Sequence, residues 1–262
     1  MSQHKKVGER GDSISGGVSL LLQKQADLFQ GLSLERIEPL LSSSRICSVD
    51  RGAVIIKQGD TVKYLYLLIE GSVRLYRTNR TGKEVSISML KAGDTFMESV
   101  LFMDGPSPVR AKALNACKFL LVPAATLRQQ IRNERSLGTN LLRIIARHYQ
   151  NAIQQIESVA TKPPLDRLGY YLLKLYMEQN PHGPYVDLLF PKTSIASHLG
   201  MTPETFSRSI RKLRALGIEL DYKRILIRKE EALCRFCDQD IAAICPKKKH
   251  HRCYGPLLGS RD

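Results

Sequence analysis

The pattern of hydrophobic and polar residues changes along the chain, from short apolar runs separated by glycines to amphipathic helical patterns. Between residues 48 and 122, the apolar runs alternate with turn pairs such as Arg51-Gly52 and Ala92-Gly93. Strands about 8–12 residues apart with turn residues between them are typical of a small β-sandwich or jelly roll. The strands that we expect are 54–56, 64–69, 73–76, 85–89 and 116–122.

After Pro123 the apolar spacing changes to the period of a helix. We expect helices over 127–131, 137–159 and 167–177, followed by a short strand over 185–190. Strands followed by helices predict an α+β chain, and its length favours two domains over one.

The predicted helix over 137–159 carries two apolar edges. Leu141, Ile144 and His148 form one edge, which we expect to face the β-rich domain. The other edge repeats at intervals of three and four residues, as in a coiled-coil heptad, and predicts a two-fold dimer interface. The alternative is one amphipathic helix packed on its own domain. The predicted interface residues are Leu142, Ile145, Tyr149, Ala152, Ile156 and Val159.

A helix-turn-helix pattern follows near the end of the chain. The first short helix ends at Gly200, and Thr202 followed by Pro203 starts the second. Threonine is a good N-cap, and proline is tolerated at the first helical position because its missing N–H would be unpaired there. The pattern therefore predicts two helices joined by a tight turn. Their apolar positions are Ile195, Ala196, Leu199, Phe206, Ile210 and Leu213.

Basic residues surround this pattern. From Lys192 to Lys229 there are nine Lys or Arg residues and three acidic ones, and the stretch around Asp221 to Arg224 alternates like a small β-hairpin. A helix-turn-helix with a basic wing places its second helix in the DNA major groove. An ordinary helical hairpin is the alternative interpretation.

Composition agrees with a soluble polyanion-binding protein. The net charge is +15, and 43% of residues are hydrophobic. No run of 18 or more apolar residues predicts a membrane span. Residues 1–17 are polar and lack a signal-peptide core, so we expect a disordered tail and a cytoplasmic protein. No nucleophile–base pair, HExxH motif or phosphate loop occurs, so we expect no enzyme.

Four of the six cysteines are crowded near the end of the chain, with the spacing C-x2-C-x7-C-x7-C. Four cysteines match the ligand count of a structural zinc site or of an iron–sulfur cluster. The alternative is a basic tail with reduced thiols, as expected in a reducing cytoplasm. The candidate ligands are Cys234, Cys237, Cys245 and Cys253.

These patterns divide the chain into five predicted segments. Pro163 and Pro164 cannot continue a helix, so we expect a hinge over 161–165. The segments are a disordered tail (1–17), a β-barrel sensor domain (18–135), a dimerisation helix (136–161), a winged helix-turn-helix (162–233) and a Cys-rich basic tail (234–262).

The order of these parts resembles the Crp/Fnr family of bacterial transcription regulators. The motifs that carry the resemblance are Gly93-Asp94, Glu98 and Leu101-Phe102, and then Leu199-Gly200 with 203–208. It implies an N-terminal double-stranded β-helix (jelly-roll, cyclic-nucleotide-binding-like) sensor, a homodimer and RNA polymerase as a partner in activation. The pattern of Glu204, Ser207 and Arg208 is similar to the Fnr and Dnr branch, which reads half-sites of the TTGAT type, and a symmetric dimer implies that two of them form a palindromic site.

The chemistry of the second helix fits this resemblance. Arg208 can donate to guanine O6 and N7, Glu204 can accept from cytosine N4, and Ser207 can contact a thymine or a phosphate. The neighbouring basic residues suit phosphate contacts, which give affinity without sequence preference. They are Arg211, Lys212, Lys223 and Arg224, and Thr202 and Thr205 complete the predicted DNA-facing set.

The predicted effector pocket comprises Met97, Glu98, Ser99 and Arg110. Cyclic-nucleotide binders of the family use a Gly-Glu pair and a later Arg-Ser pair, but Met97 replaces the glycine and Pro108-Val109 replaces Arg-Ser. A buried phosphate would lack its arginine, so we do not expect a cyclic nucleotide. The segment 97–109 is most similar to Dnr-type regulators, which implies a nitric-oxide, redox or low-oxygen signal and haem as a candidate cofactor. A ligand-binding subunit without DNA function is the alternative.

Overall fold

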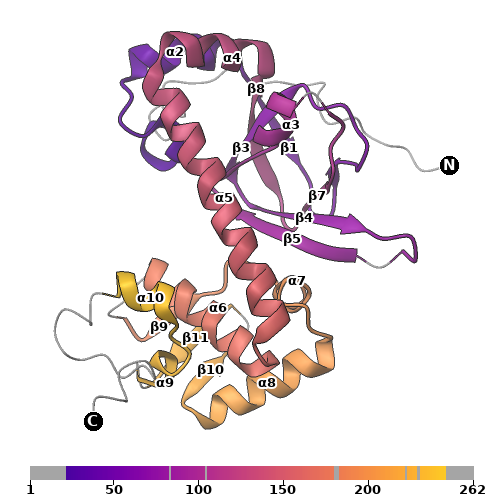
Figure 1. Cartoon of the computed structure of the whole chain (residues 1–262), viewed down its shortest axis with the longest axis vertical. Helices are drawn as coiled ribbons and strands as arrows, with labels where there is room; N and C mark the ends of the chain where they lie inside the picture. The colour runs from indigo at the N-terminus through magenta and orange to yellow at the C-terminus, as the bar shows by residue number, and fades with distance from the viewer. Residues whose placement is uncertain are drawn as a thin grey trace. The chain divides into compact units, whose positions relative to one another are not determined.

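The structure is a computed structural model that describes residues 22–82, 84–103, 105–179, 183–221, 223–228 and 231–245. The chain forms two compact units, Met1–Ile153 and Gln154–Asp262. Figure 1 is coloured by residue number, so that the strands of the first unit come early in the colour bar and the mostly helical second unit comes late.

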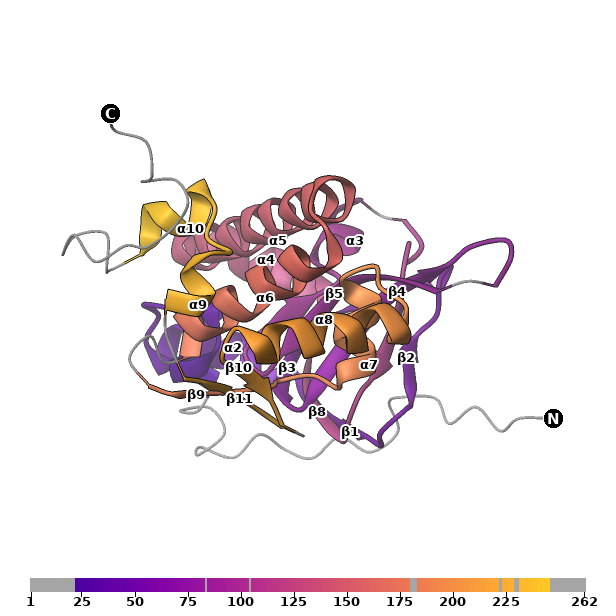
Figure 2. The ribbon, with the colours of Figure 1, turned by 90° about the horizontal axis from the view of Figure 1, so that it is seen from below.

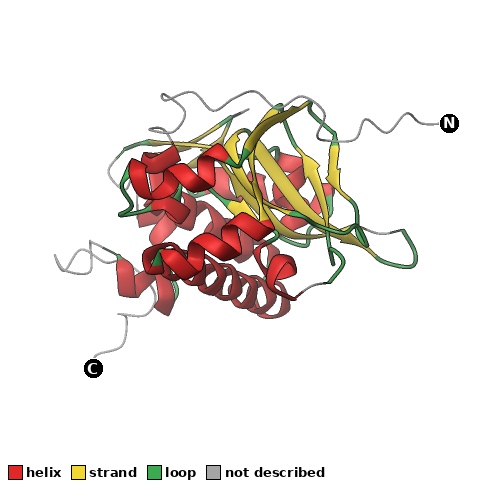
Figure 3. Cartoon of the chain, turned by 90° about the horizontal axis from the view of Figure 1, so that it is seen from above, coloured by secondary structure: helices red, strands yellow, loops and turns green. Residues whose placement is uncertain are grey.

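Unit 1 is a sandwich of two antiparallel sheets, as Figure 3 shows by the grouped strands. The jelly roll expected from the glycine-punctuated stretch is confirmed. The first sheet has the order β1 (Arg45–Val49), β8 (Cys117–Pro123), β3 (Tyr64–Glu70), β6 (Thr95–Phe96). The second has the order β2 (Val54–Ile56), β7 (Arg110–Ala113), β4 (Ser72–Thr78), β5 (Glu84–Lys91). Three of these strands, β1, β6 and β7, were not expected from the sequence.

The space between the two sheets is filled by aromatic and aliphatic side chains. Phe96 and Phe119 meet edge to face with ring centroids 6.0 Å apart, and Tyr66 stacks on Phe96 at 4.9 Å. Both phenylalanines are buried. Aromatic pairs at these separations add stabilisation beyond the area that they bury. The cluster joins β3, β6 and β8 into one core.

A second core lies under the helices of unit 1. These are η1 (Asp27–Phe29), α2 (Leu34–Ser42), α4 (Ala124–Asn133) and the first part of α5 (Arg135–Thr161), while α3 (Glu98–Met103) follows β6. Leu141 and Ile144 of α5 are buried in this core, as expected from the sequence. The buried Asn140 amide donates to the carbonyl oxygens of Leu28 (3.1 Å) and Gln30 (2.8 Å). The start of α5 is thereby fixed to unit 1.

Unit 2 has the winged helix-turn-helix arrangement (Figure 2). The helix α6 packs against the second helix of the motif, and a three-stranded antiparallel sheet with the order β10-β11-β9 completes the unit. The elements are α6 (Pro164–Gln179), β9 (Tyr185–Asp187), α7 (Lys192–His198), α8 (Pro203–Ala215), β10 (Ile218–Leu220) and β11 (Arg224–Ile227).

The division between the units lies within α5, not at the predicted hinge over 161–165. The last turns of α5 are bound to unit 2, because the Gln155 amide donates to the His198 carbonyl oxygen and the Arg167 guanidinium donates to the Val159 carbonyl oxygen at 3.2 Å. The two prolines end α5 as expected, but these contacts hold the end of the helix in place. The prediction of a hinge at the prolines was therefore wrong as a unit boundary.

Residues 231–245 fold onto unit 2, although the sequence suggested a tail from residue 234. They form α9 (Glu231–Cys234) and α10 (Gln239–Ile244), with Leu233, Phe236 and Ile241 buried. These three apolar side chains hold the segment on unit 2. Residues 1–17, expected to be disordered, and Cys253 lie outside the described residues.

We predict that Gly71→Ala destabilises the protein far more than Gly52→Ala. Both glycines have a positive φ (+96° and +85°), which costs a residue with a Cβ about 1–2 kcal/mol. A Cβ on Gly71 would also lie 2.5 Å from the Ala116 carbonyl oxygen, whereas nothing lies within 4 Å of one on Gly52. Urea unfolding should show a further loss of about 1–3 kcal/mol for Gly71→Ala. Equal losses in the two variants would contradict this packing.

Candidate nucleic-acid interface

The turn between α7 and α8 has the predicted stop and start signals. Gly200 adopts φ +64°, and Thr202 is the N-cap, with its hydroxyl oxygen accepting from the Thr205 N–H at 3.3 Å. Pro203 is the first residue of α8. Because the cap and the proline both suit a helix start, the beginning of α8 is sharply defined. This part of the sequence prediction is confirmed.

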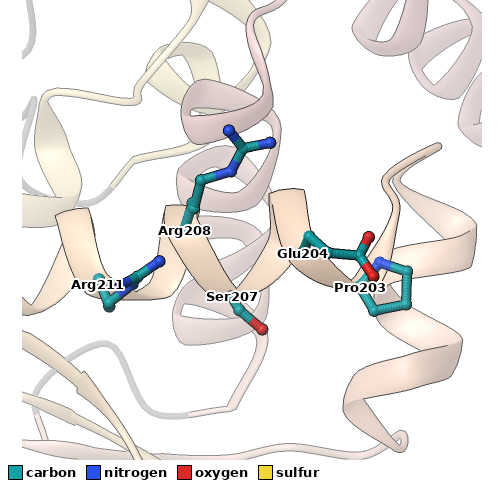
Figure 4. Close-up of a pocket in the computed structure, with 5 residues that line it drawn as sticks. All are labelled: Pro203, Glu204, Ser207, Arg208 and Arg211. Atoms are coloured by element: carbon teal, nitrogen blue, oxygen red, sulfur yellow. The ribbon is translucent and has the colours of Figure 1, made fainter.

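The helix α8 buries one face and exposes the other. Phe206 and Leu213 are buried and Ile210 is half-buried, as the apolar stripe predicted. Ser209 is also buried, which the stripe did not indicate. The opposite face carries a surface pocket, with Arg208 and Ser207 directed to different sides of the helix (Figure 4). The pocket is lined by Pro203, Glu204, Ser207, Arg208 and Arg211.

Hydrogen bonds at the start of α8 arrange two of the predicted DNA-reading side chains. The backbone N–H of Glu204 and the Thr202 hydroxyl, followed by the charge of Arg208, lower the pKa of the Glu204 carboxyl. Glu204 is therefore ionised at neutral pH and can only accept hydrogen bonds. The Arg208 guanidinium donates to the Thr205 hydroxyl at 3.4 Å, one turn earlier. The exposed acid and base thus lie on adjacent turns of one helix face.

The wing is the hairpin of β10 and β11, with Ile218 opposite Ile227 and Leu220 opposite Ile225. Lys223 and Arg224, predicted to contact phosphates, are exposed. Arg224 Nε also pairs with Asp187 Oδ1 at 2.9 Å, and both side chains are more than half exposed. An exposed ion pair contributes little, so a phosphate can compete for this guanidinium. The predicted basic residues Arg211 and Lys212 are exposed on α8.

The apolar edge of α5 is largely exposed in the single chain. Leu142, Tyr149 and Ile156 are 69%, 69% and 70% exposed, and Ala152 and Val159 are exposed too. Ile145, predicted for the same edge, is partly buried and packs on the helical core of unit 1. Sequence reasoning missed Ile153, which is 46% exposed, because a strict heptad does not include it. These side chains form an unpaired apolar surface.

Met97 occupies a strained position in the predicted effector pocket. Its φ is +76°, and it is the only non-glycine residue with a positive φ among those the structure describes. The side chain is buried in the core between the sheets, with Sδ 3.6 Å from the Ser107 hydroxyl oxygen. Of the other predicted pocket residues, Ser99 is exposed and Arg110 is half-buried on β7. Met97 therefore fills space from within the sandwich.

Glu98 lies beside α5. It is buried, accepts a hydrogen bond from the Thr95 hydroxyl, and has Oε2 3.9 Å from His148 Nδ1. The sequence suggested only that His148 was a packed or solvated histidine on the helix edge. The nearby Asp94 accepts from the Lys91 N–H at 2.8 Å, yet burial raises the pKa of its carboxyl. A group of acidic side chains thus lies where β6 and α3 meet α5.

The three cysteines described in the C-terminal region are not brought together as a metal site. Cys234, Cys237 and Cys245 are each partly exposed. Within the described ranges, no three His, Cys, Asp or Glu residues are grouped so that they could hold a metal ion. The fourth predicted ligand, Cys253, lies outside these ranges, so the four-cysteine zinc or iron–sulfur site stays a prediction, as does haem.

Comparison with known proteins identifies both units. The cyclic nucleotide-binding domain family matches residues 46–134, and the Crp-like helix-turn-helix domain family matches residues 166–236. The Cyclic AMP receptor protein of Thermus thermophilus is 29% identical over 195 residues, which cover 74% of this chain and 88% of that protein. The chain belongs to the Crp/Fnr family of transcription regulators.

Two other relatives agree with this assignment. The Global nitrogen regulator of Synechocystis is 25% identical over 79% of this chain and 93% of its own. The structure of FixK2 from Bradyrhizobium japonicum has the same fold, with a TM-score of 0.66 and 22% identity over 74% of this chain and 98% of that one. This Crp/Fnr member is a DNA-binding transcription regulator and not an enzyme.

The two matched domains leave parts of this Crp/Fnr chain outside them. All of α5 lies between the matches, and residues 237–245 follow the second. None of the helices in the described ranges has the length and apolar character needed to cross a membrane. The similarity to the Dnr branch stays a prediction.

We predict that Met97→Gly is more stable than Met97→Ala by about 1 kcal/mol, because only glycine adopts this φ without strain. Both variants lose the buried side chain and should lose about 2–5 kcal/mol of stability. Val100, buried in the helix α3, is the matched control. There the alanine variant should be the more stable one by about 0.5–1 kcal/mol. Chemical denaturation of the four variants measures these differences in stability. If the glycine and alanine variants rank in the same order at positions 97 and 100, the backbone strain at Met97 would be contradicted.

We predict that Asp94→Asn makes stability less dependent on pH. Burial is the main cause of the raised pKa of Asp94, so the folded state binds its proton more tightly than the unfolded state does. Stability is then lost as the pH rises above the ordinary pKa of aspartate. Asparagine cannot ionise but can still accept from Lys91. Urea unfolding from about pH 4 to pH 7 should show the free energy of unfolding of the variant rising relative to that of the native protein. If the two free energies change in parallel with pH, the raised pKa of Asp94 would be refuted.

Proposed function

We propose that the chain is a dimeric Crp/Fnr-type regulator that reads a palindromic TTGAT-like site and responds to a redox, nitric-oxide or low-oxygen signal. The observation that carries the DNA part is the exposed face of α8, where Glu204, Ser207 and Arg208 extend from a capped helix start. A recognition helix contacts base edges with residues of its first turns. Those turns hold the acid, the hydroxyl and the guanidinium together.

Each of these three side chains suits one type of base contact. Arg208 can donate two hydrogen bonds to guanine O6 and N7, and the ionised Glu204 can accept from the N4 amino group of cytosine. Ser207, directed to another side of the helix than Arg208, can contact a thymine or a phosphate (Figure 4). The exposed basic residues supply phosphate contacts, which position the helix. They are Arg211, Lys212, Lys223 and Arg224.

The dimer that we propose forms through α5. A 27-residue helix with Leu142, Tyr149, Ile153 and Ile156 exposed along it has an apolar surface that a second copy would cover. A symmetric pair presents two identical α8 helices. Half-site centres would then lie about 34 Å apart, one turn of DNA. RNA polymerase, contacted in activation, and a cytoplasmic location complete this proposal.

The signal that we propose is not a cyclic nucleotide, although relatives include proteins named as cyclic AMP receptors. Met97 stands where the cyclic-nucleotide binders have glycine, and its buried side chain takes up room in the sandwich. The residues Pro108 and Val109 offer no charge for a cyclic phosphate. A spectrum and metal analysis of protein purified without oxygen will separate haem, an iron–sulfur cluster and zinc.

The second candidate function is a ligand-binding subunit without DNA function, which the match to the cyclic nucleotide-binding domain family favours. The two candidates differ in binding to duplex DNA. A DNA-binding regulator loses affinity steeply as the salt concentration rises, because phosphate contacts release counterions. A ligand-binding subunit shows no salt-dependent duplex binding.

We predict that Arg208→Ala weakens binding to the preferred site by about 1–3 kcal/mol and removes the preference for guanine at one position of each half-site. Lys212→Ala is the matched control, since its side chain is exposed on the same helix and suits a phosphate. It should weaken all sequences alike and lower the salt slope by about 1. Gel-shift titrations on single-base variants measure both. Unchanged base preference in Arg208→Ala would refute the proposed role of α8.

A further inference from the structure

Two cysteines with the spacing C-x2-C close one turn of the C-terminal segment. The Cys237 N–H donates to the Cys234 carbonyl oxygen at 3.0 Å, immediately after α9. A turn closed between residues three apart holds their Cα atoms within about 7 Å. A disulfide spans Cα separations of about 4.4–6.8 Å. Both cysteines are reduced and partly exposed, and the turn between them permits a bond.

The turn between these cysteines anchors the segment to α6. Phe236 is 7% exposed, and its ring packs on Gly169 so closely that a Cβ there would lie 2.3 Å from a ring carbon. The backbone of the turn therefore sets whether the ring remains on Gly169. Leu233, the residue before Cys234, is fully buried. Any rearrangement of the turn acts first on Phe236.

The residue after the turn connects it to the end of α5. Asp238 Oδ2 pairs with Lys162 Nζ at 2.8 Å, and its other oxygen caps α10 by accepting from the Ile241 N–H at 3.1 Å. Lys162 lies between α5 and α6, with Nζ 3.9 Å from the centre of the Tyr170 ring. A change in the turn is thus transmitted to the junction of the long helix with the DNA-binding unit.

We propose that Cys234 and Cys237 are a dithiol site that low-molecular-weight disulfides oxidise to an intramolecular disulfide, which releases Phe236 from Gly169. This dithiol site would supply a redox input to the proposed regulator. Only its effect on DNA binding rests on the proposed function. The metal interpretation of the same cysteines is the competing one, and the described cysteines are not grouped as it requires.

The reaction is two thiol–disulfide exchanges. One cysteine thiolate attacks a sulfur of the small disulfide, forms a mixed disulfide and releases one small thiolate. The other cysteine thiolate attacks the protein sulfur of that mixed disulfide, displaces the second small thiolate and completes the Cys234–Cys237 bond. Two electrons pass from the cysteines to the small disulfide, and the two cysteine protons end on the two released thiols.

Forming this bond requires both side chains to leave their present neighbours. The Cys237 thiol donates to the Asp238 carbonyl oxygen at 3.4 Å. Cys234 lies near Tyr176 of α6, whose pKa is raised by burial and then by the charge of this thiol when ionised. Forming the bond brings the two sulfurs to about 2 Å from each other and changes the turn on both sides of Phe236. A ring packed so closely on a helix backbone cannot follow that movement and stay in contact.

The first experiment identifies the bond in the full chain, prepared with a chelator and equilibrated in buffers of oxidised and reduced glutathione. After alkylation, peptide mass spectrometry should find a Cys234–Cys237 disulfide in the native protein and in Cys245→Ser. Cys237→Ser should show none. Pairing of either residue with Cys245 or Cys253, no disulfide, or thiols protected by stoichiometric bound metal would each overturn the proposal.

The second experiment measures the release of Phe236 by hydrogen exchange. Oxidation should speed exchange in residues 236–245 by about tenfold or more, whereas Cys234→Ser/Cys237→Ser should not respond to glutathione. Reduced Phe236→Ala should exchange as the oxidised native protein does, because it lacks the same anchor. Unchanged exchange after disulfide formation would overturn the release. Neither readout uses DNA, so a failed DNA-binding function and a failed dithiol site give different results.

Discussion

One helix, α5, belongs to both compact units, and the function depends on that constraint. Its first turns are held in unit 1 by buried Leu141 and Ile144 and by the Asn140 amide. Its last turns are held in unit 2 through Gln155 and Val159. Between these two sets of contacts, α5 exposes Leu142 and Tyr149, the side chains that the proposed dimer would cover.

In unit 1, the segment between β6 and α3 places an acidic side chain beside this helix. Glu98 is paired with the Thr95 hydroxyl and lies near His148, which is part of α5. Met97, in a conformation normally reserved for glycine, fills the neighbouring core. A buried carboxylate is costly unless it is hydrogen-bonded or paired. The arrangement therefore joins the segment between β6 and α3 to α5 through polar contacts.

The sequence predicted best those regions where several local signals agreed. At the start of α8, the glycine, the threonine cap, the proline and the apolar stripe all favoured the same boundary, and tertiary packing did not change it. Strands β1, β6 and β7 were missed because each is short and is fixed by pairing with distant strands, which a local pattern does not reveal. Ile145, predicted for the dimer interface, packs on unit 1 instead, and Ile153, for which no role was predicted, is exposed, because local packing decides which edge of α5 is covered. The fold of residues 231–245 was missed because their cysteines were interpreted as metal ligands in a tail, and the apolar residues between them were not considered as a packing face.

The contact of Phe236 with Gly169 also has a consequence for how this chain could have evolved. No side chain larger than hydrogen can occupy position 169 while the ring lies there, and no aromatic ring can lie there once position 169 carries a Cβ. Position 169 of α6 and position 236 of the C-terminal segment are therefore coupled: a change at either one alters which side chains the other can accept. The absence of a side chain at Gly169 is what gives the C-terminal segment its place on α6.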